Sequence, residues 1–273
     1  MKKILITGNS GYIGSHLTKL LIKDNIVHGL DIKDPIVNTN WFLKTSINHP
    51  IIMDEQYDVV IHLAALVNVN ESERNAIMYY ITNTNGTMNV VKNIKCKHFI
   101  FASTGAAEYC YSPYGVSKRA AEDIVKEYCR SHRPIPYTIF RFYNVIGSDG
   151  IKPTNPDGLF YNLLKAKNSG NFTIYGKDYE TPDGTCLRDY VHVNEICNAI
   201  KKAIDKPSNS IESLGHGVGY SVKEIVDKFQ KVNDCYIHTT YGPRRQGDLP
   251  VSVLENVSPY MENLYTIEEL LKV

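Results

Sequence analysis

Short runs of apolar residues alternate, in the first half of the chain, with segments in which apolar residues recur every three or four positions. The runs predict strands at residues 2–7, 27–31, 57–63, 98–103 and 136–142. The segments predict three helices. The first begins near residue 13, the second ends with residues 85–93, and the third covers residues 114–132. Strands that alternate with helices are typical of a parallel sheet with helices on both faces.

After Asn144 this alternation gives way to loops rich in Pro and Gly, with helices predicted at residues 159–167, 193–204 and 221–231. The last of these begins with Ser221, and Glu224 three residues later completes a capping-box pattern. We therefore expect an α/β protein with a doubly wound parallel sheet of the Rossmann type in residues 1–144. Residues 145–273 are expected to form a smaller lobe, with some segments that return to the first domain.

Composition excludes several classes of partner. The 273 residues carry 30 Lys and Arg against 29 Asp and Glu, a formal net charge of +1, so no global field attracts nucleic acid or an anionic membrane. The apolar run after Met1 is too short for a signal peptide, and no run is long enough to span a bilayer. The six cysteines are scattered without metal-ligand spacing. We expect a cytoplasmic protein without a metal site, in which local groups bind any phosphate.

A glycine-rich turn joins the first strand to the first helix. Gly8, Gly11 and Gly14 are each separated by two residues, a spacing that differs from the G-x-G-x-x-G fingerprint. Such a turn lets the backbone approach a pyrophosphate and directs the helix N-terminus at it, although glycines alone also occur in any tight turn. Asp31 ends the second strand, where a carboxylate accepts hydrogen bonds from an adenosine ribose and repels a 2′-phosphate. Together these features predict an NAD site that disfavours NADP.

Candidate acid–base groups follow in the long helix. Tyr114 and Lys118 lie four residues apart, on one helix face, a pair that also occurs by chance on amphipathic helices. A free tyrosine titrates near pH ~10, so a tyrosine base needs a nearby positive charge, which Lys118 and an oxidised nicotinamide provide. Thr104 ends the preceding strand, where its hydroxyl would face the carboxyl edge of the sheet. Tyr, Lys and a hydroxyl beside a dinucleotide are the groups that oxidation of a secondary alcohol requires.

These residues belong to longer motifs. The chain resembles the extended short-chain dehydrogenase/reductase family over nearly its whole length, and within it the nucleotide-sugar epimerases of the UDP-glucose 4-epimerase group. The motifs of the superfamily are at residues 7–16, 60–65, 83–87, 112–118 and 141–144. The motifs that resemble the epimerases more than their relatives are at residues 183–193, 214–219 and 243–250.

The resemblance implies an activity. It implies an NAD-dependent isomerase that epimerises a UDP-hexose at C4, plain or N-acetylated, through transient oxidation to a 4-keto sugar. Tyr114 would be the base, Thr104 its hydroxyl partner, and Lys118 the group that holds the nicotinamide ribose and lowers the pKa of Tyr114. The predicted partner is a small-molecule nucleotide sugar, without nucleic acid or membrane, and a homodimer is compatible with the resemblance.

The resemblance also assigns binding residues. Residues 1–144 would be the NAD-binding domain and residues 145–273 the substrate-binding lobe. The cofactor-binding residues would be Gly8, Gly11, Tyr12, Ile13, Gly14, Asp31, Ile32, Ser46, Ile47, Leu63, Ala64, Ala65, Asn83, Ala102, Tyr114, Lys118 and Tyr143. The substrate-binding residues would be Thr104, Tyr114, Asn144, Tyr175, Arg188, Arg245, Asp248 and Ser252. Arg188 has an alternative, a structural pair with Asp189, and His62, His192 and His216 are expected to be packing or capping residues.

The chain departs from the family pattern in places that bear on function. Only residues 105–113 separate Thr104 from Tyr114, a loop that is usually longer, and the C-terminal part after Ser252 is short. Ser46 and Ile47 stand where the family usually has Asp and an apolar residue. A 4,6-dehydratase typically has Asp-Glu after the threonine, and Gly105-Ala106 cannot do that chemistry. A keto-sugar reductase and a non-catalytic NAD-binding protein remain as alternatives, although the latter would not need the base.

Overall fold

The computed structural model describes all 273 residues, and their contacts divide the chain into two compact units. The first unit comprises Met1–Phe142 and Ile196–Glu212. The second comprises Tyr143–Glu195 and Ser213–Val273. The chain therefore leaves the first unit after β6, the strand that ends at Phe142, and returns to it for one helix and most of one strand.

A parallel sheet forms the centre of the first unit. Its strands are β1 (Lys3–Thr7), β2 (Ile26–Asp31), β3 (Trp41–Lys44), β4 (Gln56–His62), β5 (Lys95–Thr104), β6 (Tyr137–Phe142) and β10 (Ser210–Leu214). Their order in the sheet is β10-β6-β5-β4-β1-β2-β3. The order reverses between β1 and β4, and in doubly wound sheets a ligand binds beyond the carboxyl ends of the strands at such a reversal. The predicted Rossmann-type fold is confirmed.

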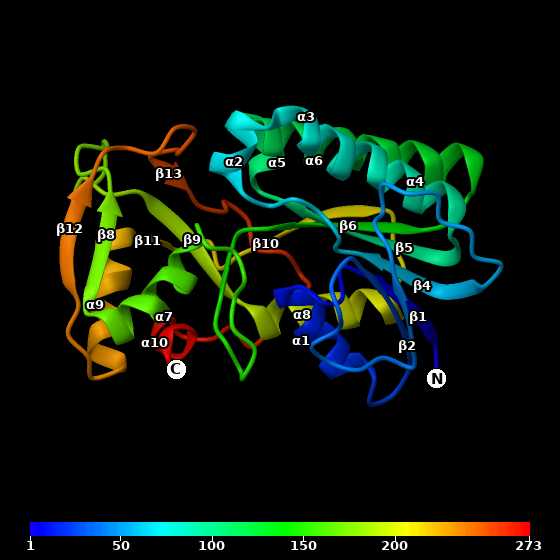
Figure 1. Cartoon of the computed structure of the whole chain (residues 1–273), viewed down its shortest axis with the longest axis horizontal. Coiled ribbons are helices and arrows are strands. Elements are labelled where there is room, and N and C mark those ends of the chain that lie inside the picture. The colour runs from blue at the N-terminus through cyan, green and yellow to red at the C-terminus, as the bar shows by residue number, and fades with distance from the viewer. The chain divides into compact units, whose positions relative to one another are not determined.

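Helices cover both faces of this sheet. They are α1 (Tyr12–Leu21), α2 (Val69–Arg74), α3 (Ala76–Tyr79), the π-helix η1 (Tyr80–Asn85), α4 (Gly86–Asn93), α5 (Ala106–Tyr109), α6 (Pro113–Glu127), the π-helix η2 (Tyr128–His132) and α8 (Val193–Asp205). Figure 1 shows α4 and α6 along one face and α1 and α8 along the other. Leu5, Val60 and Phe99 from the sheet join Ala121 and Val125 from α6 in one buried cluster. The strands are thus buried on both sides, which explains their continuous apolar runs.

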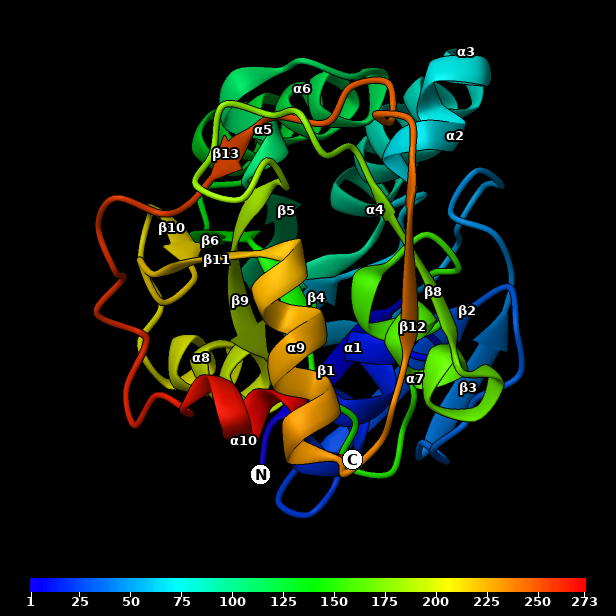
Figure 2. The ribbon, with the colours of Figure 1, turned by 90° about the vertical axis from the view of Figure 1, so that its left-hand side faces the viewer.

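The second unit has shorter strands around β9. Its elements are β7 (Asn144–Ile146), α7 (Leu159–Ser169), β8 (Asn171–Tyr175), β9 (Leu187–His192), β11 (Gly219–Ser221), α9 (Val222–Val232), β12 (His238–Gly242), β13 (Val251–Ser252) and α10 (Ile267–Leu271). β9 pairs with β7, β11 and β13, and β8 pairs with β12. Figure 2 shows α9 beside α10, and their apolar faces share a core with α7 that includes Phe160, Phe229 and Leu270.

Most of the predicted elements are present, and the differences have local causes. The predicted helix at residues 114–132 is α-helical only to Glu127, because the last turn bonds as a π-helix, with Arg133 N donating to Tyr128 O at 3.0 Å. β3 was not predicted, because it is a short edge strand in which Trp41 is 41% exposed. The capping box at Ser221 and Glu224 is confirmed. No helix has both the length and the apolar character that crossing a membrane requires.

Candidate active site

The glycine turn is shaped so that only glycine fits. Gly8 has a φ of +76°, and a Cβ there would lie 2.6 Å from the backbone nitrogen of Ala64. A Cβ on Gly14 would lie 2.1 Å from the carbonyl oxygen of Gly8. Helix α1 begins after Gly11 without a side-chain cap, so the N–H groups of its first turn are available to an anion. The turn fits the pyrophosphate of a dinucleotide.

Asp31 links the end of β2 to this turn through hydrogen bonds. Its Oδ2 accepts a hydrogen bond from Ser10 N and its Oδ1 accepts one from Lys33 N, both at 3.0 Å. Ser10 Oγ completes the link by donating to Lys33 O at 2.9 Å. A carboxylate has about four acceptor positions, so Asp31 retains capacity for the two hydroxyls of a ribose. The predicted role of Asp31 is compatible with this geometry.

The other predicted cofactor residues differ in how far they are buried and in where they lie on the sheet. Ala64 N donates to Thr7 Oγ1 at 3.3 Å, which holds the backbone after β4 next to the end of β1. Ile47 is 4% exposed and packs against Gly86, whereas Ile32 is 63% exposed. Ala102 is buried near the end of β5.

Asn83 is held by hydrogen bonds from both ends of its side-chain amide. Its Oδ1 accepts from Leu66 N at 2.8 Å, and its Nδ2 donates to Leu66 O at 2.9 Å and to Ser117 Oγ at 3.0 Å. Ser117 Oγ in turn donates to Tyr114 O at 2.8 Å. Asn83 therefore connects the segment after β4 to the catalytic helix α6. Asn83 Oδ1 accepts one bond and keeps a second acceptor position, so its contact with the cofactor stays a prediction.

The three predicted catalytic residues come together in the first unit. Helix α6 begins at Ser112, whose Oγ accepts from Gly115 N at 3.2 Å. Tyr114 is 9% exposed, and its hydroxyl lies close enough to the Thr104 side chain to interact with it. Lys118 is 3% exposed, and its Nζ lies 4.1 Å from the centroid of the Phe101 ring. The loop between Thr104 and Tyr114 contains the short helix α5.

Burial dominates the electrostatics of this trio. Burial raises the pKa of Tyr114 to about 12, although the hydrogen bond from Thr104 opposes the rise. Burial lowers the pKa of Lys118 to about 7, although the nearby Glu122 carboxylate opposes the fall. The protein groups alone therefore do not produce the expected lowering of the Tyr114 pKa by Lys118. The positive charge of an oxidised nicotinamide is the remaining contribution that would lower it.

The predicted substrate residues of the second unit gather around β9. Arg188 Nη1 donates to Leu249 O at 2.7 Å, and Arg188 Nη2 lies 3.6 Å from Asp248 Oδ1. Ser252 is the register partner of Arg188. Asn144 Nδ2 donates to the backbone oxygen of Asp189 at 3.0 Å. The alternative pair of Arg188 with Asp189 is not formed, because Arg188 turns toward Asp248.

Arg245 is held over an exposed aromatic ring. Its guanidinium carbon lies 4.1 Å from the centroid of the Tyr175 ring, and its Nη1 donates to Asp157 O at 3.2 Å. Guanidinium has five donors in a planar fork, so this stacking leaves donors for a phosphate. Tyr175 is 40% exposed, and a flat exposed ring suits a nucleobase or sugar.

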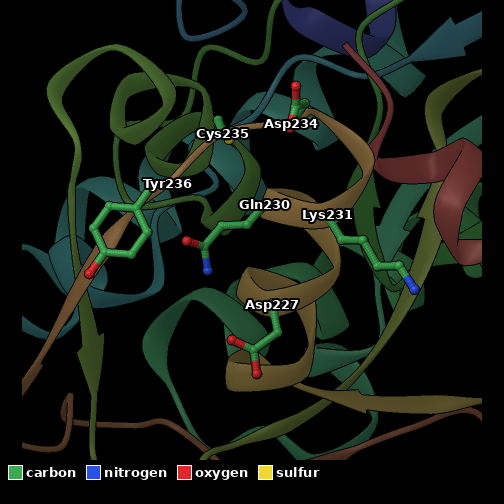
Figure 3. Close-up of a pocket in the computed structure, with 6 residues that line it drawn as sticks. All are labelled: Asp227, Gln230, Lys231, Asp234, Cys235 and Tyr236. Carbon is green, nitrogen blue, oxygen red and sulfur yellow. The ribbon is translucent and has the colours of Figure 1, made fainter.

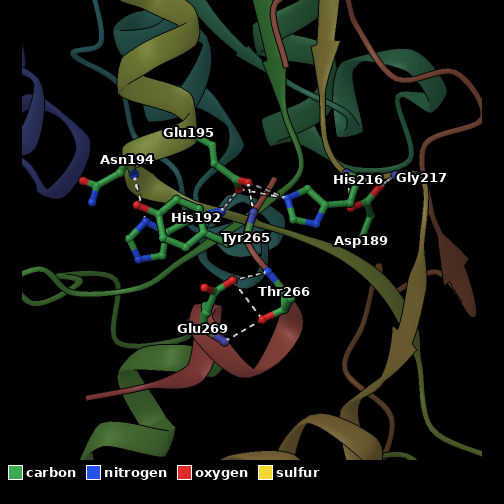
Figure 4. A network of polar contacts seen from close by, with 9 residues as sticks. All are labelled: Asp189, His192, Asn194, Glu195, His216, Gly217, Tyr265, Thr266 and Glu269. Carbon is green, nitrogen blue, oxygen red and sulfur yellow. Dashed lines mark hydrogen bonds and ion pairs between the residues drawn. The ribbon is translucent and has the colours of Figure 1, made fainter. Parts of the chain in front are cut away.

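A buried polar network supports these residues and was not predicted. Asp189 is fully buried and accepts from the backbone nitrogens of His216 and Gly217, both at 2.8 Å, and of Leu254 at 3.3 Å. Glu195 accepts from Tyr265 N at 2.8 Å and contacts His216 Nε2 at 2.9 Å. Figure 4 shows the contacts of Asp189 with His216 and Gly217 and those of Glu195 with Tyr265 and His216. The sequence offered little signal for this network, because Asp189 follows the charged Arg188 in β9 and its partners lie in distant segments.

The histidines have the structural roles that the sequence predicted. His192 stacks on Tyr265 with ring centroids 4.5 Å apart, and its Nδ1 accepts from Asn194 N at 3.1 Å. His216 pairs with Glu195, and His62 is buried between two threonine hydroxyls. A hollow on the surface of α9 and the turn after it contains none of the predicted site residues (Figure 3). It is lined by Asp227, Gln230, Lys231, Asp234, Cys235 and Tyr236.

Comparison with known proteins identifies the family. Residues 4–215 match the NAD dependent epimerase/dehydratase family. The chain belongs to this family. It is 30% identical to the UDP-glucose 4-epimerase of Pasteurella multocida over 296 aligned positions, which cover 90% of this chain and 87% of that protein. The NAD-dependence of the family confirms the predicted cofactor.

Solved structures of the family have the same fold. The chain superposes on the UDP-glucose 4-epimerase from Bifidobacterium longum, solved with NAD⁺ and UDP, with a TM-score of 0.87 and 26% identity. That match covers 98% of this chain and 96% of the other. The UDP-Glc/GlcNAc 4-epimerase from Campylobacter jejuni gives a TM-score of 0.77 and 26% identity, covering 100% and 97% of the two chains.

Proposed function

We propose that this enzyme interconverts UDP-hexoses that differ in configuration at C4, both plain and N-acetylated. The observation that carries the proposal is the trio in the first unit, in which the Tyr114 hydroxyl lies beside the Thr104 side chain and Tyr114 lies one helical turn before the buried Lys118. The trio has the groups that oxidation of a secondary alcohol and reduction of the resulting ketone require. The similarity of the chain to proteins named UDP-glucose 4-epimerases supports this reaction.

The side chains of the first unit perform the proton transfer. Tyr114 takes the proton of the substrate's 4-hydroxyl and returns it to the oxygen after the sugar has turned over. Thr104 orients the phenolic hydroxyl. Lys118 would hold the nicotinamide ribose, so that the positive charge of the oxidised ring favours the deprotonated form of Tyr114. NAD, when bound, supplies reversible hydride acceptance at C4. The glycine turn would hold its pyrophosphate and Asp31 its adenosine ribose.

The second unit would anchor the nucleotide. Arg188 and Arg245 carry guanidinium groups suited to a diphosphate, and Asp248 lies beside Arg188, where it would meet the uridine ribose. Tyr175 offers an exposed ring under Arg245, and Asn144 lies on the strand next to β9. Firm anchoring of the diphosphate leaves the sugar free to present either face after oxidation.

Two other enzyme activities and one non-enzymatic role compete with this proposal. A keto-sugar reductase would use the same trio but would exchange its cofactor in every turnover. A 4,6-dehydratase needs acid–base groups after the threonine, and Gly105 and Ala106 supply none. A non-catalytic NAD-binding protein would need the glycine turn but not a buried tyrosine beside Thr104.

We further propose that the enzyme forms a homodimer through one face of the first unit. Helical residues on this face expose apolar side chains: Ile77 is 72%, Met88 46% and Ile81 37% exposed. A second copy of the chain would bury such a patch. Light scattering of the wild-type enzyme should give twice the 30.9 kDa mass of one chain. The Ile81→Glu variant should give the mass of a single chain.

The experiment that tests the activity uses the purified enzyme without added cofactor. UDP-glucose, UDP-galactose and their N-acetyl counterparts are incubated separately, and the anomeric protons are followed by NMR. The proposal expects each substrate to approach an equilibrium mixture of the two C4 epimers. Turnover that depends on a continuous supply of NADH would support the reductase, and no turnover of any substrate would contradict the proposal.

A further inference from the structure

A fully buried carboxylate lies one helical turn after Lys118. Glu122 has 0% exposure, and it follows Tyr114 and Lys118 on the same face of α6 at a spacing of four residues. Ser103 Oγ donates to Glu122 Oε1 at 2.6 Å. Arg141 donates to both carboxylate oxygens, from Nε to Oε1 at 2.9 Å and from Nη2 to Oε2 at 2.7 Å.

These contacts fix α6 at the end of the sheet that carries the catalytic threonine. Ser103 and Arg141 are register partners in the pairing of β5 with β6, and Ser103 is followed directly by Thr104. Glu122 therefore bonds to two neighbouring strands within one residue of Thr104. Because a buried bidentate ion pair has a narrow geometry, it sets how far along the strands the helix lies.

The charges around Lys118 make Glu122 its only nearby counter-charge. On α6 itself the titratable neighbours are Tyr114 and Glu122, and β6 contributes the cationic Arg141. Burial, with a smaller contribution from the nearby Lys118, lowers the pKa of His62 on β4 to about 3, so His62 is neutral. β5 contributes the uncharged ring of Phe101, while Tyr79 of α3, bonded to Glu71 of α2, packs edge-on against Tyr114.

We propose that Glu122 is a positioning residue that registers α6 against Thr104 and supplies the negative charge that keeps Lys118 protonated. Arg141 also pairs with this negative charge, since it donates hydrogen bonds to both oxygens of the Glu122 carboxylate. Without the Glu122 carboxylate, Lys118 would lie near the positive charge of Arg141 with no negative charge to balance it. Without the Arg141 guanidinium, the negative charge of Glu122 would act on Lys118 alone. The two changes should therefore act on Lys118 in opposite directions.

The test titrates Lys118 directly in the full chain, labelled with ¹³C at the lysine ε-carbon, and identifies its NMR signal by its loss in Lys118→Arg. In Glu122→Gln the midpoint should fall by about one pH unit or more. In Arg141→Gln it should rise. Ser103→Ala removes one donor from the carboxylate and should give a smaller rise, which keeps the test open if Arg141→Gln does not fold.

Glu195→Gln is the matched control, because Glu195 is also a buried carboxylate but belongs to the second unit. It should leave the Lys118 midpoint unchanged within about 0.2 pH units, a fifth of the lower shift that an opposite charge typically causes. An unchanged midpoint in folded Glu122→Gln, or shifts of the same sign in Glu122→Gln and Arg141→Gln, would overturn the inference. Loss of turnover in Glu122→Gln rests on the proposed function, but the titration needs no substrate, so the two can fail separately.

Discussion

Ser252 lies opposite Arg188, as its register partner in the parallel pairing of β13 with β9. The side chain of Ser252 is small and intermediate in exposure, and the segment after it is held by the bond from Leu254 N to the buried Asp189. If Arg188 grips the diphosphate, the residue opposite it lies near the sugar. A serine there leaves room for an N-acetyl group, which a bulky aromatic residue would exclude.

Ser252→Tyr should therefore suppress turnover of N-acetylated UDP-hexoses more than that of the plain ones. We expect the ratio of kcat/KM for the two substrate types to change by about tenfold or more, the effect of a modest steric clash in a pocket. Competition kinetics measures this ratio, and Ser252→Ala is the matched control that should preserve it. An unchanged ratio in the tyrosine variant would show that Ser252 does not line the sugar site.

Tyr114→Phe should remove catalysis and leave NAD bound. The variant loses only the hydroxyl beside Thr104, while the buried ring keeps its edge-on contact with Tyr79. Loss of a general base typically costs 100-fold or more in rate, on the order of 3 kcal/mol. Single-turnover rates and the nucleotide content of the purified variant check this. A variant that retained most of its turnover would place the base elsewhere.

The carboxylate of Asp31 should select NAD over NADP. We expect NAD to bind at least about tenfold more tightly, because the 2′-phosphate would meet an unneutralised carboxylate. Asp31→Asn keeps an acceptor for the turn and removes the charge, so it should narrow this difference. Calorimetric titration with both nucleotides gives the affinities, and equal affinity for both in the wild type would contradict the assignment.

Acid should destabilise the enzyme through His62. His62 Nδ1 accepts from Thr7 Oγ1 at 2.6 Å and its Nε2 lies 3.0 Å from Thr87 Oγ1. Burial lowers its pKa from the ordinary 6.5 to about 3, so between these values the unfolded chain binds a proton that the folded chain does not. The free energy of unfolding should therefore fall as the pH falls through this window.

The contribution of His62 should be about 1 kcal/mol per pH unit between pH 5 and 6. Denaturant unfolding at several pH values should show this slope reduced by that amount in His62→Gln. His98, whose pKa burial lowers to about 4, is unchanged in that variant and should continue to contribute a similar slope. Equal slopes in the wild type and the variant would mean that His62 is not held neutral in the folded state.

Local patterns predicted five of the seven strands in the sheet of the first unit, all except β3 and β10. Continuous apolar runs identified its central strands, and the glycines at positions 8, 11 and 14 marked the turn that a side chain would block. The short strands β7, β11 and β13 could not be predicted in this way. Each is two or three residues long and forms only because β9 offers it a partner, which is information that a local window does not contain.

The supporting residues of the candidate site were harder to find than the reactive ones. Tyr114 and Lys118 are recognisable from their spacing on one helix. Glu122 continues the same spacing, but its importance depends on Arg141, which lies on a distant strand. Asp189 likewise acquires its role from backbone groups that lie 27 or more positions away in the sequence. Such pairings become visible only when the chain is folded.

The most direct test of the proposed reaction follows the hydrogen at C4. UDP-glucose that carries deuterium at C4 is incubated with the enzyme in ordinary water, and the product is analysed by NMR and mass spectrometry. Oxidation and reduction within one active site predict UDP-galactose that retains the deuterium at C4. Product that has exchanged this deuterium for solvent hydrogen, or the absence of any C4 epimer, would contradict the account.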